Sequence, residues 1–492
     1  MKDVIVIGGG VAGLIAARAC ARVGLSVTVL EATGVPGGAL GSHEVAGLTL
    51  DSGAESFAVR RNAVAEFIAD LGLSDEVVAP NPAGAWLQLP DDRVPGGSVS
   101  VPLPKAGVLG IPGSPLADDV RRVIGWSGAW RAYADRLMPV LTIGREHSLG
   151  ELVRKRMGRR VLERLVEPVT AGVYSSSADD LEIDVVAPGL NSALTVTGSL
   201  SGAVLSLRSG APAGSNVAGL RGGMSRLVAA LVADLAHFDA EIVTDAPVTA
   251  LRRSGTEDAP TWTVTCAAPP ADAPDAPDAP AAATTLAARF VIIATPGAQA
   301  LALLADLSPA HAALAELDWP QPTAIELATI VIDAPELDAH PRGTGVLVAA
   351  ATPGVSAKAL THVTAKWEWL AAAAGPGRHV IRLSYGRAGQ DNPTAGLRDD
   401  ELLALSLADA RTILGVDLDA AAVRGFARTV WGDALSPATV GAPERVSQVR
   451  EIVTATPGLE LTGAWLAGTG LASVIPDAVA AASRTRHEAL GI

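Results

Sequence analysis

Residues 3–31 read DVIVIGGGVAGLIAARACARVGLSVTVLE, and this stretch decides the fold. Residues 3–7 are a short β-branched run typical of a buried strand, and residues 25–30 are a second run of the same kind. Between them, residues 12–23 carry Ala, Leu and Ile at helical spacing. The stretch therefore predicts a βαβ unit, and with it an α/β fold built on a parallel sheet.

The turn between the first strand and the helix carries Gly8, Gly10 and Gly13 in the pattern G-x-G-x-x-G. Such a turn lets the backbone approach a pyrophosphate, and the helix N-terminus offers free N–H groups to it. Glu31 ends the second strand, 31 − 10 = 21 residues after Gly10, where its carboxylate can accept ribose hydroxyls. The acid disfavours a 2′-phosphate, so the motif predicts NAD or FAD rather than NADP.

Two further segments favour FAD. Gly37 and Gly38 form a glycine pair just behind the ribose acid, as is typical of proteins that bind FAD in an extended form. Near the other end of the sequence, residues 459–466 predict a strand and Pro476 to Leu490 a helix opened by a proline. A helix that begins near Pro476 would point its dipole at the flavin and stabilise negative charge there.

Composition excludes several classes of protein. The net charge is −14, which argues against a nucleic-acid partner, and 49% apolar with 18% charged residues is a globular composition. The two cysteines, Cys20 and Cys266, cannot build a disulfide framework or a cysteine metal site, so we expect a cytoplasmic protein without a metal. No apolar run is long enough to span a bilayer, and we expect membrane contact to be peripheral at most.

The rest of the chain predicts a second sheet and several helices. We expect helices over 62–72, 224–236 and 399–413, a helix-rich insert over 117–170, and strands over 241–251, 261–266, 320–332 and 378–386. Residues 80–115 hold many Pro and Gly and predict loops and turns. The low-complexity stretch 267–283 predicts a mobile surface loop within a hairpin.

Several blocks resemble the bacterial protoporphyrinogen/coproporphyrinogen III oxidases, within the amine-oxidase-like flavoproteins. They are VIVIGGGVAGLIAA, VLEATGVPGGALGS, LDSGAESFAVRR, VPLPKAGVLGIPGSP, EPVTAGVYSSSADDLEID, LRGGMSRLVAAL, THVTAKWEWL, VIRLSYGRAG and TVWGDALSPATVGAPERV. The Ala-rich stretches and the preference for Arg give the chain the look of an actinobacterial member. One departure lies near the end of the sequence, where the family's G-V-G-I-P-D is replaced by residues 472–477, ASVIPD.

The resemblance implies a Rossmann-like FAD-binding domain, a mixed-sheet substrate domain and a helical insert. The FAD-binding domain would comprise residues 1–57, 211–300 and 441–492. The substrate domain would comprise 58–95 and 301–440, and the mainly helical insert 96–210.

The resemblance also implies the activity. An enzyme of this family passes hydride from a porphyrinogen to FAD, and O2 reoxidises the flavin with release of H2O2. We expect coproporphyrinogen III as the substrate, within haem biosynthesis, and a possible hand-off of product to a ferrochelatase. Protoporphyrinogen IX, another flavoenzyme of the same group (an amine oxidase or a carotenoid desaturase) and a non-catalytic escort protein stay open as alternatives.

The residues that match the family's blocks give the expected site. The cofactor residues would be Gly8, Gly9, Gly10, Val11, Ala12, Gly13, Glu31, Ala32, Gly38, Ala39, Gly53, Ala54, Glu55, Ser56, Val248, Trp431, Val474, Ile475 and Pro476. The substrate residues would be Arg61, Gly172, Tyr174 and Lys366. Because hydride transfer to a flavin needs little acid–base machinery, no catalytic residue is assigned beyond the candidates Lys366 and Gly172. Lys366 is expected in a strand-like segment, and Gly172 with Tyr174 in a turn at the substrate cavity.

Overall fold

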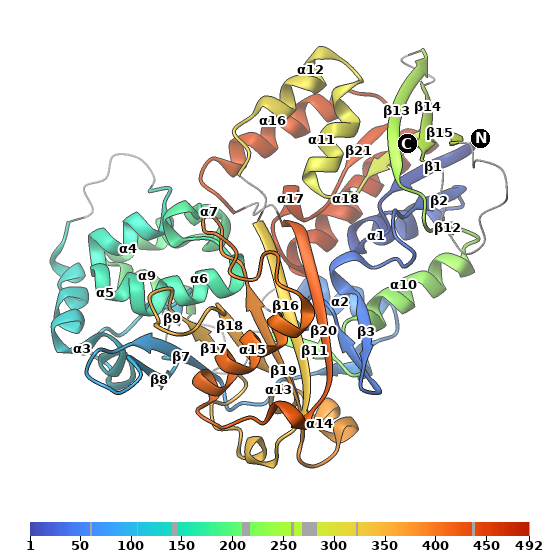
Figure 1. Cartoon of the computed structure of the whole chain (residues 1–492). Helices are drawn as coiled ribbons and strands as arrows, with labels where there is room; N and C mark the ends of the chain where they lie inside the picture. Colours follow the sequence, from blue (N-terminus) through green and yellow to red (C-terminus); the bar gives the residue numbers. More distant parts are fainter. Residues whose placement is uncertain are drawn as a thin grey trace.

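The computed structural model describes residues 1–59, 62–105, 107–139, 146–208, 217–256, 260–267, 283–320, 323–434 and 438–491, and for residues 433 and 434 the backbone alone. Two seven-stranded sheets and a helical region make up the fold, and Figure 1 shows the helical region at the far end from the N-terminus. Arg60 and Arg61, and most of the predicted mobile loop 267–283, lie outside the described residues.

The first sheet has the order β12-β2-β1-β15-β14-β13, with β21 also paired to β15. Its strands are β1 (Lys2–Ile7), β2 (Val27–Leu30), β12 (Glu241–Val243), β13 (Val248–Gly255), β14 (Pro260–Cys266), β15 (Thr284–Ile293) and β21 (Leu459–Leu461). The strands β12, β2, β1, β15 and β21 run parallel, while β14 joins β15 and β13 by antiparallel pairing. The predicted parallel α/β sheet is confirmed, and it gathers three distant segments of the chain.

The central strand β1 is buried on both faces, as its unbroken β-branched run requires. Val4 and Val6 pack with α1 (Val11–Ala21), α10 (Ser225–His237) and α18 (Leu471–Leu490). Ile5 and Ile7 face the other way, toward α11 (Gly297–Ala305) and α16 (Ala442–Thr454). Successive side chains of β1 point to opposite faces of the sheet, so the strand contributes to a hydrophobic core on each face.

The second sheet has the order β20-β16-β19-β18-β17-β7-β8. Its strands are β7 (Ala85–Pro90), β8 (Ser98–Pro102), β16 (Thr323–Asp333), β17 (Gly345–Val348), β18 (Ala359–His362), β19 (Arg378–Tyr385) and β20 (Val423–Ala434). All neighbours are antiparallel except β17 and β7, which makes the sheet mixed. The helix α15 (Asp399–Leu414) covers one face of it.

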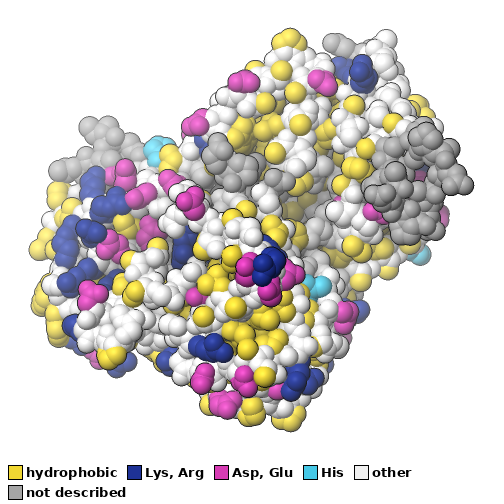
Figure 2. All heavy atoms as spheres, viewed as in Figure 1, with side chains coloured by type: hydrophobic (Ala, Val, Ile, Leu, Met, Phe, Trp, Pro, Cys, Tyr) yellow, Lys and Arg dark blue, Asp and Glu magenta, His cyan; other side chains and the backbone are white. Residues whose placement is uncertain are grey.

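The helical region has a core of its own, which also takes in Leu87 and Leu89 of β7. Its helices are α3 (Asp118–Tyr133), α4 (Leu149–Met157), α5 (Arg159–Val161), α6 (Glu167–Tyr174), α7 (Ile183–Val186), α8 (Leu190–Thr197) and α9 (Leu200–Arg208). Lys and Arg side chains gather on its surface, at the left of Figure 2. Within the described ranges no single helix is long and apolar enough to cross a membrane, although α8 and α9, bent by 116°, meet that test as a pair.

Three predictions about elements were wrong. Residues 80–115 hold strands β7 and β8 as well as turns. The two strands pair with each other, and β7 also pairs with the distant strand β17, which the local sequence does not reveal. The strand over 459–466 ends at Leu461, and residues 464–467 form one helical turn, α17 (Ala464–Ala467). The last helix begins at Leu471 behind Gly470, so Pro476 lies inside it and does not open it.

Candidate functional site

The glycine turn between β1 and α1 has the geometry that dinucleotide binding needs. Gly8 has φ +107, and a Cβ atom added to Gly13 would overlap the Gly8 carbonyl oxygen, so strand and helix pack this closely only without side chains there. Around Gly10 the situation is reversed, because a Cβ atom added there would meet no atom within 4 Å. No side chain caps the N-terminus of α1. The turn therefore leaves open space in front of free backbone N–H groups, as a pyrophosphate requires.

Glu31 closes over this turn from the end of β2. Its Oε2 accepts a hydrogen bond from the Gly9 N–H at 2.8 Å, and its Oε1 accepts from the Thr33 N–H at 2.9 Å. The Glu31 carbonyl oxygen accepts from the Ala246 N–H at 2.8 Å, which brings the start of β13, and with it Val248, to the same corner. A carboxylate at the end of the second strand is the group that accepts the ribose hydroxyls in sites of this type.

The second glycine pair is joined directly to the first turn. The Gly37 N–H donates to the Gly9 carbonyl oxygen at 2.9 Å, and Gly10 and Gly37 form a β-bridge. The segment Ala32 to Ala39, which includes Gly38 and is exposed except at Pro36 and Gly37, thus passes beside Gly10.

The segment 53–56 continues from there. The Ala54 N–H donates to the Ala39 carbonyl oxygen at 2.9 Å. A Cβ atom added to Gly53 would overlap that same oxygen and would lie 3.1 Å from the Trp431 ring of β20. The predicted cofactor residues of four separate blocks are therefore contiguous in space.

The C-terminal helix α18 meets the turn through the shared core. Val474 and Ile475, in its first two turns, are buried with Val11 and Ala12 of the first turn of α1. Gly468 and Gly470, with φ +99 and +93, stand just before α18. Gly470 is therefore the residue before the helix N-terminus, and Pro476 lies further along the helix, where it is exposed. The dipole of α18 accordingly starts at Leu471, not at Pro476.

These features together fit an FAD. The molecule has open space for an anion beside Gly10, an acid for a ribose at Glu31, a run of backbone contacts from Gly37 to Gly53, and the first turns of α18 packed against α1.

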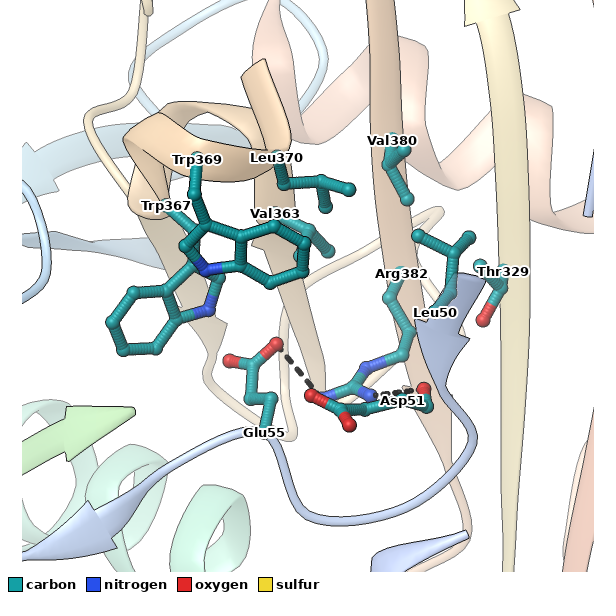
Figure 3. A pocket seen from close by; sticks show the side chains of 10 residues that line it. All are labelled: Leu50, Asp51, Glu55, Thr329, Val363, Trp367, Trp369, Leu370, Val380 and Arg382. Carbon is teal, nitrogen blue, oxygen red and sulfur yellow. Dashed lines mark hydrogen bonds and ion pairs between the residues drawn. The ribbon is translucent and has the colours of Figure 1, made fainter. Parts of the chain in front are cut away.

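Behind the 51–56 segment lies a pocket of ten side chains, shown in Figure 3. Its lining comprises Leu50, Asp51, Glu55, Thr329, Val363, Trp367, Trp369, Leu370, Val380 and Arg382. Glu55 lies between two cations: its Oε1 is 2.6 Å from Lys366 Nζ, and its Oε2 is 3.0 Å from an Arg382 guanidinium nitrogen. Arg382 also donates to the backbone carbonyl oxygens of Asp51 and Gly53, at 3.1 and 3.0 Å.

The pKa values of two carboxyl groups at this pocket are shifted in opposite directions. Burial alone would raise the pKa of Glu55, but the charges of Lys366 and Arg382 overcome it and hold that pKa below the usual range. Burial raises the pKa of Asp51 to about 6, although the Met224 N–H donates to Asp51 Oδ1 at 2.8 Å. Glu55 is therefore a fixed anion, and Asp51 is the group of the two that titrates near neutrality.

The structure corrects the expectations for Lys366. It ends a helical turn, α13 (Val363–Lys366), and does not lie in a strand. Its ammonium group is half-buried against Glu55 and is thereby engaged in an internal ion pair. Sequence reasoning missed Arg382, and a signal existed: it is the one charged residue in the interior of the otherwise apolar run VIRLSY.

The structure also corrects the expectations for Gly172 and Tyr174. Both belong to helix α6, and Tyr174 is its last residue. A Cβ atom added to Gly172 would lie 2.5 Å from Leu347 Cδ2, so this glycine lets α6 pack closely on β17. The predicted loop turn follows only at Ser175, which has φ +57. Arg61, the fourth predicted substrate residue, lies outside the described residues.

Comparison with known proteins agrees with this geometry. The family described as "Flavin containing amine oxidoreductase" matches residues 11–485. A coproporphyrinogen III oxidase of Mycobacterium bovis is 30% identical, over 98% of this chain and 96% of that protein. One of Bacillus subtilis is 26% identical, over 98% and 97%. A solved structure from Exiguobacterium sp. 255-15, assigned provisionally as a protoporphyrinogen oxidase, has a TM-score of 0.79 at 25% identity and covers 100% of this chain and 99% of that one.

Proposed function

Since the chain belongs to the flavin containing amine oxidoreductases, and within them to the bacterial protoporphyrinogen/coproporphyrinogen oxidase family, we propose that it oxidises coproporphyrinogen III to coproporphyrin III with O2. It is an FAD-dependent oxidoreductase that oxidises a porphyrinogen in haem biosynthesis. The choice of coproporphyrinogen III and of O2, with release of H2O2, is the part that we propose.

The observation that carries the proposal is the continuity of the site. The glycine turn, Glu31, the segment 53–54 and Trp431 lie next to one another although they come from four blocks of sequence. These are blocks that resemble the porphyrinogen oxidases, and relatives matched over nearly their whole length bear the name coproporphyrinogen III oxidase.

When bound, FAD supplies the acceptor for a hydride from the substrate. The chain's own residues bind and orient it. The N–H groups at the start of α1 would hold the pyrophosphate, and Glu31 the ribose hydroxyls. Arg382 donates to the carbonyl oxygens of Asp51 and Gly53 and thereby fixes the backbone of this segment.

Neither cation at Glu55 is free to act on the substrate. Lys366 and Arg382 both pair with the buried carboxylate, so we propose a supporting role for the pair: they stiffen the 51–56 segment beneath the cofactor. Each two-electron step removes a proton from the substrate as well as a hydride. Because both cations are paired with Glu55, we assign the acceptance of that proton to solvent and not to either of them.

The test is the appearance of porphyrin fluorescence from coproporphyrinogen III, with flavin-loaded protein, in air and under nitrogen. We expect a rate well above the spontaneous background in air, H2O2 as the second product, and no turnover under nitrogen. Protoporphyrinogen IX, measured beside it, should be oxidised more slowly. A rate equal to the background with flavin-loaded protein would refute the proposal, and preference for protoporphyrinogen IX would correct the substrate.

We further propose that the reaction takes place in the cytoplasm and that the product passes to a ferrochelatase. Both proposals rest on the family resemblance and on the composition of the chain.

A further inference from the structure

A buried lysine lies outside the site described so far. Lys358, just before β18, is 1% exposed, and its Nζ donates to the Ser175 hydroxyl oxygen at 2.5 Å. Burial, together with the charge of Arg387, lowers the pKa of Lys358 to about 7. A lysine in such surroundings keeps its charge only if something negative comes close.

A second cation stands beside it. Arg387 follows β19, and one of its terminal nitrogens donates to the Val348 carbonyl oxygen at 3.1 Å. The Val348 N–H in turn donates to the Lys358 carbonyl oxygen at 2.9 Å, and the Ala388 N–H donates to the Ser175 carbonyl oxygen at 2.7 Å. Lys358, Ser175 and Arg387 therefore meet at the point where α6 ends against the second sheet.

The two cations have no anion. Among the residues that the structure describes, neither forms a salt bridge, and the Nε of Arg387 is buried without a hydrogen-bond partner. Asp409 is held beside the residue that precedes Lys358, because its carboxylate accepts from the Ala357 N–H at 2.8 Å, and it is also engaged by the Tyr385 hydroxyl at 3.2 Å. A buried lysine beside an arginine gives up its proton readily, and an anion bound next to the two groups would restore its charge and offset the cost of burial.

The end of α6 adds an exposed apolar side chain to this place. Arg387 is only partly buried, and α6 next to it carries Gly172 and Tyr174. Between these two, Val173 exposes 59% of its surface. An exposed apolar side chain two residues before Ser175 and a guanidinium without a carboxylate partner match an amphipathic carboxylic acid such as a porphyrinogen bearing propionates.

We propose that Arg387, backed by Lys358, binds one carboxylate of the substrate. The Arg387 guanidinium makes the direct contact. The Lys358 ammonium group, held in place by its hydrogen bond to Ser175, adds positive charge behind it. This inference rests on the proposed function, because it takes a carboxylated porphyrinogen as the ligand.

The experiment measures the affinity of the flavin-loaded protein for coproporphyrin III and for its tetraamide, which keeps the ring and lacks the charges. The variants are Arg387→Gln and Lys358→Met, with Arg93→Gln as a control, since Arg93 is an exposed arginine of the β7–β8 connection. Arg387→Gln should weaken coproporphyrin III binding by about ten- to a hundred-fold, and Lys358→Met by about three- to tenfold. Neither should change tetraamide binding, and the control should match the wild type.

The outcomes separate the two proposals. If wild type binds neither coproporphyrin III nor the tetraamide, the proposed function fails and takes this inference with it. If wild type binds coproporphyrin III and both variants bind it equally well, only the inference is overturned. If one variant does not accumulate as folded, flavin-loaded protein, the other decides alone, because each removes one of the two cations. Equal losses for both porphyrins would show a structural effect and would also overturn it.

Discussion

At the scale of single residues, the three fingerprint glycines do different work. Gly13 has no room for a Cβ atom within the protein itself, whereas Gly10 has an extended backbone with φ −67 and open space before it. The requirement for glycine at position 13 therefore comes from packing, and at position 10 from the ligand.

This difference gives a prediction for two alanine variants. Gly13→Ala should lower the stability of the flavin-free protein by about 1 to 3 kcal/mol, because the added methyl group overlaps the Gly8 carbonyl oxygen. Gly10→Ala should leave that stability nearly unchanged and weaken FAD binding instead. Thermal unfolding of the flavin-free protein and titration with FAD measure the two effects. Wild-type FAD affinity in Gly10→Ala would mean that the pyrophosphate does not occupy this space.

Asp51 gives a pH-dependent prediction. Its pKa in the folded protein is about 6 because of burial, above the ordinary value of 3.8, so the folded state prefers the protonated form. The contribution of Asp51 to the free energy of unfolding is therefore fully present below about pH 4 and is lost as the pH rises through 6. Asp51→Asn removes this loss, and at pH 7 it should raise the free energy of unfolding by about 2 to 3 kcal/mol. Urea unfolding at pH 4 and pH 7 tests this, and an equal effect at both pH values would contradict it.

The pKa of Glu55 is shifted in the opposite direction to that of Asp51, so its contribution to stability has the opposite pH dependence. Because Lys366 and Arg382 hold its pKa below the usual range, the ion pairs stabilise the fold above about pH 4.5 and lose that effect as the pH falls. Lys366→Met should cost about 1 to 3 kcal/mol at pH 7, since Arg382 still partners the buried carboxylate. The exposed pair of Lys2 with Glu241 offers a control, and Lys2→Met should cost less than about 1 kcal/mol. Equal unfolding midpoints in urea for the two variants would rule out the buried pair as a stabilising unit.

At the scale of elements, α18 connects the end of the chain to the glycine turn. Ile475 is 3% exposed in the core that α1 shares, while Pro476 beside it is exposed and interrupts the helical hydrogen bonding. Ile475→Ala should therefore lower stability by about 2 to 5 kcal/mol and reduce the bound FAD, whereas Pro476→Ala should lower neither. Thermal unfolding and flavin content of the purified variants measure this. If the Ile475→Ala variant is destabilised but keeps its full flavin content, α18 does not support the cofactor site.

Sequence patterns predicted the elements whose signal is local. The βαβ unit, helix α10, strands β16 and β19 and helix α15 each carry their own periodicity and cap or turn residues, and all are present. Strands β7 and β8 were missed because the surrounding Pro and Gly indicate turns, while β7 exists through its parallel pairing with β17. The start of α18 was misplaced because a proline usually marks a first helical turn, and here Gly470 sets the boundary.

At the scale of the whole molecule, proximity within one short motif could be predicted, and contacts between distant segments could not. Gly8, Gly10, Gly13 and Glu31 belong to one short motif, so their joint position follows from the βαβ unit. Lys366 and Glu55 lie 311 residues apart, and Lys358 and Ser175 lie 183 apart, so only the folded chain brings them together. The roles of the individual site residues and the division into segments 1–57, 58–95, 96–210, 211–300, 301–440 and 441–492 stay predictions.

The central claim is that electrons pass from a porphyrinogen to the flavin of this protein. Its most direct test is to mix flavin-loaded protein with coproporphyrinogen III in the absence of O2 and to follow the flavin absorption band by stopped flow. We expect the band to bleach as porphyrin absorption rises, and to return when air is admitted. A flavin that stays oxidised, beside a substrate that stays colourless, would contradict the claim.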